Sequence, residues 1–266
     1  MDIEVRPSLQ LVSTLLAGRK GLVVGIANEN SLAWGCARVF RELGAEVAVT
    51  WLNDKARAHV EPLAKALEAP IAMPLDVEKP EQMEAVFAAI RSQWGRLDFA
   101  LHSIAYAPSQ ELHGRVADTS RDGFARAVDI SCHSFVRMAR LAEPLMDRGG
   151  ALLTMSFVGA DQVIPHYGVM GPVKAALEST VRYLAAELGG RGIRVNAVSP
   201  GPIPTRAASG IPGFDELALD ARQRAPVQRA ITLDDVGTLS AFLISDAAQS
   251  ITGDTLYVDN GFHIVA

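Results

Sequence analysis

Tyr167 and Lys174 are the residues of this 266-residue sequence whose types and spacing best suit acid–base chemistry. If both lie on one α-helix, a separation of seven positions places them two turns apart on the same face. A lysine close to a tyrosine favours the phenolate and so lowers the tyrosine's pKa, and an ammonium also hydrogen-bonds a ribose hydroxyl. A Tyr-x6-Lys pair alone is a weak pattern, because chance surface pairs outnumber catalytic ones. The surrounding elements must therefore decide whether this pair is catalytic.

The elements that would position this pair alternate regularly along the chain. Short apolar runs rich in β-branched residues predict strands at Gly21–Gly25, Glu46–Trp51, Ile71–Leu75, Leu97–His102, Ala151–Ser156, Arg194–Val198 and Thr255–Val258. Apolar residues at three- and four-residue spacing predict helices at Leu32–Leu43, Asp54–Leu67, Glu81–Trp94, Arg121–Met146, Val169–Leu188 and Asp234–Ser245. This βαβ alternation predicts an α/β fold, a doubly wound parallel sheet of the Rossmann type, as a single domain over residues 1–266. Residues 1–18 are expected to form an N-terminal extension.

Composition and charge argue against several other classes of protein. Apolar residues make up 49% of the chain and charged residues 21%, as in an ordinary globular domain. A formal net charge of −5 repels a phosphate backbone, so we expect no nucleic-acid partner. We also expect no membrane span, since no uninterrupted apolar run approaches ~18 residues, and no signal peptide. The two cysteines form no CxxC pair, which favours a cytoplasmic, reducing location and no metal site.

The loops that follow the strands are the place to look for a site, because doubly wound sheets bind ligands beyond the carboxyl ends of their strands. After the first strand, residues 25–35 do not form a GxGxxG motif. Gly25 nevertheless suits a tight turn, Ala27 allows close approach, and Ser31 begins a helix whose free N–H groups attract a phosphate. The alternative is an ordinary strand-to-helix loop with Ser31 as the helix N-cap, and this segment alone favours neither interpretation.

The next loops would hold the adenosine part of a dinucleotide. Leu52, after the second strand, is neither an acid for a free ribose 2′-hydroxyl nor a base for a 2′-phosphate. No cation precedes Lys55 in this loop, which favours NADH over NADPH. Asp76 and Val77 follow the third strand and residues 103–105 follow the fourth, where adenine and ribose would lie. For Asp76 alone, a turn or a helix cap is an equal alternative.

Several motifs occur in an order that identifies a family. They are Gly25-x5-Ser31-Leu32-Ala33-x-Gly35, the Tyr-x6-Lys spacing, His102–Ala105, Asp129–Ser131, Val169–Gly171, residues 201–211 and Val258–Phe262. From Gly25 to Gly261 the chain resembles the short-chain dehydrogenase/reductase superfamily and, within it, the enoyl-acyl-carrier-protein reductases of bacterial type II fatty acid synthesis. Ordinary superfamily members carry TGxxxGxG and Tyr-x3-Lys, and the two departures in this chain mark the enoyl reductase branch.

The resemblance implies an enzyme that transfers hydride from NADH to the 2,3-double bond of an enoyl chain on acyl carrier protein, and that forms a homotetramer. Tyr167 would hydrogen-bond the thioester carbonyl as hydride reaches the β-carbon, and Lys174 would bind the nicotinamide ribose. Residues 199–215 would be the mobile substrate loop. The remaining residues would be Gly25, Ala27, Ser31 and Leu32 at the pyrophosphate, Leu52 near the adenosine ribose, Asp76 and Val77 at adenine, Ser103 and Ala105 at ribose, Ile203 and Thr205 at the nicotinamide and its phosphate, and Phe157 and Ala207 at the substrate.

Some residues depart from the family pattern. Phe157 stands where many relatives have a tyrosine, and prolines occupy unusual positions at Pro172, Pro200 and Pro204. These departures concern the substrate rather than the reaction, so two alternatives stay open. In the first alternative, the chain is a divergent member of the branch that reduces another enone or ketone. In the second, it is a nucleotide-binding protein without enzymatic activity. Retention of the tyrosine and the lysine speaks against the second alternative.

Overall fold

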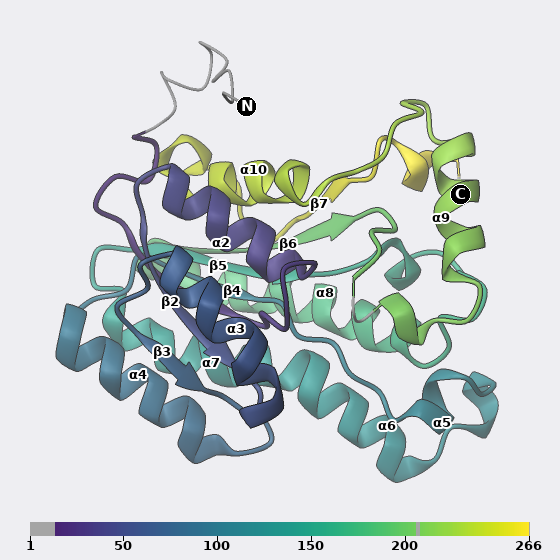
Figure 1. Ribbon diagram of the computed structural model, residues 1–266, viewed down its shortest axis with the longest axis horizontal. Coiled ribbons are helices and arrows are strands. Elements are labelled where there is room, and N and C mark those ends of the chain that lie inside the picture. Colours follow the sequence, from purple (N-terminus) through teal and green to yellow (C-terminus); the bar gives the residue numbers. More distant parts are fainter. Residues whose placement is uncertain (1–13, 206–207, 266) are drawn as a thin grey trace.

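Seven parallel strands form one sheet in the order β3-β2-β1-β4-β5-β6-β7 in the computed structural model, which describes residues 14–205 and 208–265 (Figure 1). The strands are β1 (Lys20–Val24), β2 (Glu46–Trp51), β3 (Ala72–Pro74), β4 (Phe99–His102), β5 (Gly150–Met155), β6 (Ile193–Pro200) and β7 (Thr255–Val258). Strand order reverses between β1 and β4, as in the predicted Rossmann-type fold, so that prediction is confirmed. Most of the predicted N-terminal extension (1–18) lies outside the described residues.

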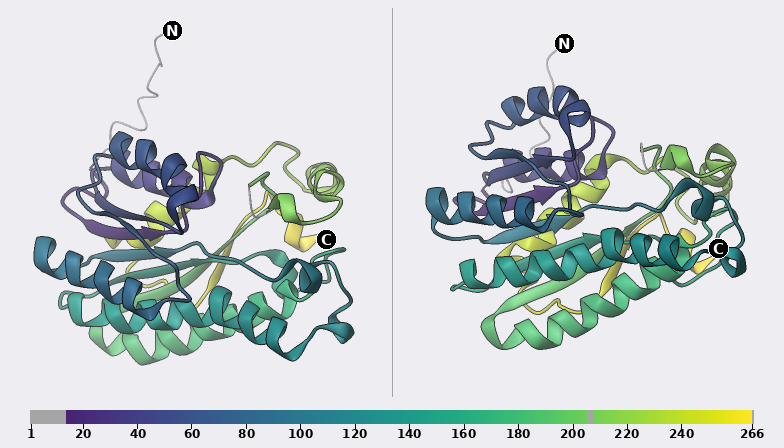
Figure 2. Two further views of the ribbon diagram at one scale, coloured as in Figure 1. Left: turned by 60° about the horizontal axis from the view of Figure 1, so that its bottom comes forward. Right: turned by 90° about the horizontal axis from the view of Figure 1, so that it is seen from below.

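Helices cover both faces of this sheet (Figure 2). One face carries α2 (Leu32–Glu42), α3 (Asp54–Ala66) and α10 (Leu233–Ile244), and the other carries α4 (Pro80–Trp94), α7 (Ser134–Ala142) and α8 (Met170–Leu188). Each layer of helices encloses its own apolar core, with Phe40 in the first and Phe135 in the second. Because both faces are covered, the central strands are predominantly apolar, and all four residues of β4 are buried.

The helix predicted over Arg121–Met146 is interrupted. The structure has α6 (Arg121–Val128), a wide π-helical turn at Asp129–His133, α7, and a final 3₁₀ turn at Glu143–Leu145. At the wide turn, the Ser134 N–H bonds the Asp129 carbonyl, while the Ser134 hydroxyl donates to the Ile130 carbonyl (2.6 Å). A side-chain donor thus takes the carbonyl that an α-helical N–H would use. Hydrophobic spacing does not report this competition, so the prediction of one continuous helix was wrong.

Two helices were not predicted from the sequence, α5 (Ser109–Leu112) and α9 (Phe214–Arg224). The first is a single turn, too short for a hydrophobic period, and the second buries only Ala221. Both lie beyond the carboxyl end of β6, on the right of Figure 1. Within the described part of the chain, no helix is long and apolar enough to cross a bilayer, and no three His, Cys, Asp or Glu side chains are grouped to hold a metal ion.

The centre of the sheet depends on a close approach between β1 and β4. Gly21 pairs with Phe99, whose ring lies edge-on to Phe40 with 5.2 Å between ring centroids. A Cβ at position 21 would lie 2.0 Å from the Phe99 ring. The aromatic pair therefore occupies space that exists only because residue 21 has no side chain, in an interior where close packing leaves little room to shift.

We expect Gly21→Ala to lower the free energy of unfolding by about 1 to 3 kcal/mol, because the added methyl group overpacks the core beside Phe99. Urea unfolding of the wild type and the variant measures this difference. Gly189→Ala is the matched control, since no atom lies within 4 Å of a Cβ at that position. Equal losses in the two variants would contradict a specific role for the Gly21–Phe99 contact.

Candidate active site

A cavity of about 700 Å³ opens at the carboxyl ends of the strands, where doubly wound sheets bind their ligands. Its walls come from the loops that follow β1 to β6, so residues distant in sequence meet there. The predicted site residues that line it are Gly25, Ala27, Ser31, Leu32, Leu52, Asp76, Val77, Ser103, Ala105, Phe157, Tyr167, Lys174, Ile203 and Thr205. Ala207 lies outside the described residues.

The loop between β1 and α2 is shaped by Gly25 and Ser31. Gly25 has φ of +111°, and a Cβ there would lie 2.0 Å from the Ser103 carbonyl oxygen, so only glycine fits. Ser31 occupies the N-cap position, but its hydroxyl oxygen accepts hydrogen bonds from the N–H groups of Ala27 and Asn28 (both 3.0 Å) instead of capping α2. No side chain at the N-cap engages the first N–H groups of α2, and this arrangement suits an anion.

The loops after β2 and β3 form the next part of the wall. Leu52 is 54% exposed at the rim, and Lys55 also lines the cavity. Asp76 lines the cavity while its carboxylate accepts a hydrogen bond from the Glu78 N–H (3.0 Å). The turn contact and the place in the wall, given as alternatives for Asp76 from the sequence, are therefore compatible.

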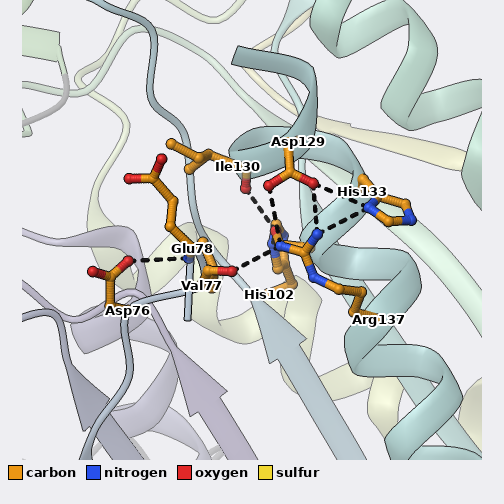
Figure 3. A network of polar contacts seen from close by, with 9 residues as sticks. Asp76, Val77, Glu78, His102, Asp129, Ile130, His133 and Arg137 are labelled. Atoms are coloured by element: carbon orange, nitrogen blue, oxygen red, sulfur yellow. Dashed lines mark hydrogen bonds and ion pairs between the residues drawn. The ribbon is translucent and has the colours of Figure 1, made fainter. Parts of the chain in front are cut away.

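Two arginines from the segment after β4 hold the loop that follows β3. Arg137 donates from Nη2 to the Val77 carbonyl (2.8 Å) and from Nη1 to the Asp129 carboxylate (2.5 Å), as Figure 3 shows. Arg126 makes two hydrogen bonds, both 2.8 Å, to the Glu78 carboxylate. The sequence analysis did not identify either arginine. Its one indication of a functional role in this region was the motif Asp129–Ser131. The wide turn at Asp129–His133 brings these groups against the cavity wall.

His102 lies behind the cavity at the end of β4 and is fully buried. Burial, and then the nearby charge of Lys174, lowers the pKa of His102 to about 3, so the ring is neutral. Its Nε2 lies 2.7 Å from the Ser134 hydroxyl and its Nδ1 lies 3.1 Å from the Thr154 hydroxyl. Since the Ser134 hydroxyl donates to Ile130, Nε2–H is the donor to Ser134 and Nδ1 accepts from Thr154.

Tyr167 does not lie on a helix, contrary to the prediction that it shares a helical face with Lys174. It precedes α8, in a turn where its N–H bonds the Ile164 carbonyl and its carbonyl accepts from the Met170 N–H, both at 3.2 Å. The ring packs at 58° against Phe157, with 4.9 Å between ring centroids. The two side chains still reach one cavity, because the turn directs Tyr167 back over the end of β5.

Lys174 lies on α8 with only 4% of its surface exposed. Its Nζ donates to the Met155 carbonyl at the end of β5 (2.6 Å). Pro172, one of the prolines singled out from the sequence, lies in the first turn of the helix, where an N–H has no intrahelical partner to lose. The proline therefore leaves α8 intact and the lysine in the cavity wall.

The pKa of Tyr167 is raised, mainly by burial and then by the charge of Glu178. The sequence argument that Lys174 lowers this pKa is therefore wrong for this structure. Burial lowers the pKa of Lys174 to about 8. At neutral pH the site thus contains a neutral phenol, which can donate a hydrogen bond, and an ammonium.

The segment after β6 closes the remaining side of the cavity. Ile203 is buried, and the Thr205 N–H donates to its carbonyl (2.8 Å). The Thr205 hydroxyl oxygen accepts from the Ala208 N–H (3.2 Å). The expected substrate loop, residues 199–215, begins within β6 and ends within α9, so regular elements anchor both of its ends.

Comparison with known proteins gives a consistent result. The family model described as enoyl-(acyl carrier protein) reductase matches residues 25–263. The chain is 47% identical over 253 residues to "Enoyl-[acyl-carrier-protein] reductase [NADH] 1" of Rhizobium meliloti, covering 95% of this chain and 93% of that one.

Solved structures agree with this match. The enoyl-(acyl-carrier-protein) reductase of Anaplasma phagocytophilum, solved in complex with NAD, superposes with a TM-score of 0.92 at 45% identity, covering 96% of this chain and 97% of that one. The Bacillus cereus enoyl-acyl carrier protein reductase, solved with NADP+ and indole naphthyridinone, gives a TM-score of 0.92 at 40% identity, covering 95% and 99%. With its fold, its cavity and a match over most of its length, the chain belongs to the enoyl-(acyl carrier protein) reductase family.

Proposed function

We propose that this protein is an NADH-dependent enoyl-acyl-carrier-protein reductase that reduces the 2,3-double bond of an acyl thioester in fatty acid biosynthesis. The observation that carries the proposal is that Tyr167 and Lys174 line the same cavity as the loop between β1 and α2, in a chain of this family. A phenol and an ammonium are then available beside a site that suits a dinucleotide.

The cavity fits a dinucleotide on its own geometry. Gly25 leaves space that any Cβ would fill, and the first turn of α2 presents N–H groups to an anion such as a pyrophosphate. In our proposal Ala27, Ser31 and Leu32 hold the pyrophosphate, while the adenosine lies against the loops after β2, β3 and β4. When bound, NADH supplies the hydride.

The two central side chains have different tasks in this proposal. Tyr167 keeps its proton because burial raises its pKa, so it donates a hydrogen bond to the thioester oxygen as that oxygen gains charge. Lys174 uses its ammonium to hold a ribose hydroxyl of the cofactor. Phe157 has no hydroxyl, so it forms an apolar wall beside Tyr167 and takes no part in proton transfer.

The proposal also covers the partners and the location. The acyl chain would arrive on acyl carrier protein, with residues 199–215, including Ala207, as the substrate loop. Both cysteines, Cys36 and Cys132, are free and buried, which supports the reducing environment of the cytoplasm.

An assay with purified protein, NADH and a crotonyl thioester, beside a panel of simple ketones, tests the proposal. Oxidation of NADH that depends on the thioester supports it. Turnover with ketones alone would favour a divergent short-chain dehydrogenase/reductase. NADH binding without turnover of any substrate would indicate a nucleotide-binding protein that has lost its chemistry.

We expect kcat/KM to be higher with NADH than with NADPH by about tenfold or more, because the loop from Trp51 to Asp54 offers no cation to a 2′-phosphate. Steady-state kinetics with both cofactors measures the ratio. A preference for NADPH would contradict the prediction and point to Lys55, which lines the cavity. Lys55→Ala would then remove that preference, whereas Arg57 is engaged with the Trp51 ring at 5.6 Å.

Tyr167→Phe and Lys174→Ala should separate turnover from cofactor binding. The first keeps the ring but removes the donor, so kcat should fall on the order of 10²-fold while NADH affinity is unchanged. The second removes the partner of a bound hydroxyl, so NADH affinity and turnover should both fall. Fluorescence titrations of NADH and single-turnover rates measure the two effects. Near-normal turnover in Tyr167→Phe would mean that the hydrogen bond comes from another group.

We also expect a homotetramer. On the outer face of α8, Tyr183 is 71% exposed, and beside it lies a shallow hollow between α7 and α8 lined by Val136 and Ala176. An exposed tyrosine beside a partly apolar hollow suits a contact between copies of the chain. Light scattering across micromolar concentrations measures the mass, and a monomer of 28.4 kDa would contradict the prediction.

A further inference from the structure

Glu178 lies on α8 one turn after Lys174 and is directed to the same strand end. The Lys174 ammonium donates to the Met155 carbonyl (2.6 Å), and the hydroxyl of the next residue, Ser156, donates to the Glu178 carboxylate. Two consecutive residues at the end of β5 are therefore tied to two residues spaced i, i+4 on one helix. Together these four residues form a clamp between β5 and α8.

The clamp supports the part of the site where the chemistry is proposed. Ser156 is 4% exposed and lines the cavity, and Phe157, which follows it, packs against Tyr167. Glu178 is half-buried and lies behind Ser156, outside the cavity wall. The Glu178 carboxylate therefore does not line the cavity in which cofactor and substrate would bind. The function proposed above assigns it no role.

We propose that Glu178 is a positioning residue, which holds the end of β5 through Ser156 and provides the negative charge that compensates the buried ammonium of Lys174. The proposal rests on the function proposed above, because it assigns Lys174 to the cofactor. It assigns Glu178 no contact with the reacting atoms.

The charges around Lys174 support this assignment. Burial lowers the pKa of Lys174 to about 8, and the nearby Cys132 side chain, from the wide turn, and the Glu178 carboxylate oppose that effect. His102, from β4, is neutral and adds no second cation. The Tyr167 phenol keeps its proton, so it contributes no anion either.

Glu178 has its own surroundings. Burial raises its pKa, while hydrogen bonds from Ser156 and Thr255 and the charge of Arg182 oppose the increase and Asp161 adds to it. Burial raises the pKa of Tyr257, from β7, and the nearby charge of Glu178 adds to that increase. Removing the negative charge of Glu178 would therefore lower the pKa of Lys174 further, and the ammonium would be lost at a lower pH.

NADH binding as a function of pH tests the proposal, measured by fluorescence titration of the full-length protein. Glu178→Gln keeps an oxygen to accept from Ser156 but removes the charge. We expect NADH affinity like that of the wild type at mildly acidic pH, and a loss of affinity on the basic side that begins about one pH unit lower. Glu178→Asp keeps the charge and should retain the wild-type profile.

Glu84→Gln is the control, since it removes the same charge from an exposed helical position on α4 that lies outside the cavity wall. A profile of Glu178→Gln that equals those of the wild type and this control would overturn the proposal. The same substitution is then made in a Lys174→Met background. If Glu178→Gln shifts the pH profile of NADH binding equally there, the proposal is also overturned, because the effect of Glu178 must act through the lysine.

The test separates this inference from the proposed function, because it reads cofactor binding and not turnover. A shifted profile in a protein that reduces no enoyl thioester would support the role of Glu178 and contradict the proposed function. An unshifted profile in an active reductase would contradict the role of Glu178 alone.

Discussion

A lysine ammonium held inside a protein must receive acceptors and compensating charge in place of the water that it loses. Lys174 meets this constraint with the Met155 carbonyl at the end of β5 and with Glu178 one turn further along α8. The packing of α8 against the sheet, through Val173 and Leu177, places the ammonium at that strand end. The geometry of the candidate active site follows from this contact.

The protonation states of two neighbouring side chains are compatible with the positive charge of Lys174. His102 is buried close by, and its pKa is lowered so far that no second cation forms beside Lys174. Tyr167 is also buried, and its raised pKa keeps the phenol protonated. A protonated phenol donates a hydrogen bond to an oxygen that gains negative charge, which a phenolate does not do. The sequence argument expected Lys174 to favour the phenolate of Tyr167. Burial instead keeps the phenol protonated beside the ammonium.

The part of the cavity wall formed by the loop after β3 contains carboxylates and arginines. The chain carries a net charge of −5, which disfavours an anionic cofactor at long range. Asp76 and Glu78 add carboxylates at the wall, and Arg126 and Arg137 hold this loop from the segment after β4. The first turn of α2 therefore offers an anion a local attraction, although the molecule as a whole is acidic.

Much of the fold was determined by the sequence itself, because strands covered on both faces are predominantly apolar and their alternation with amphipathic helices admits few topologies. The loop residues of the site were also identifiable, since parallel strands bring the loops after them to one edge of the sheet. Tertiary structure alone decided the wide turn at Asp129–His133, where the Ser134 hydroxyl competes with the backbone for a carbonyl. It also decided the protonation of Tyr167, because a pKa depends on burial and on charges from other elements, such as Glu178, that the spacing of two residues does not contain.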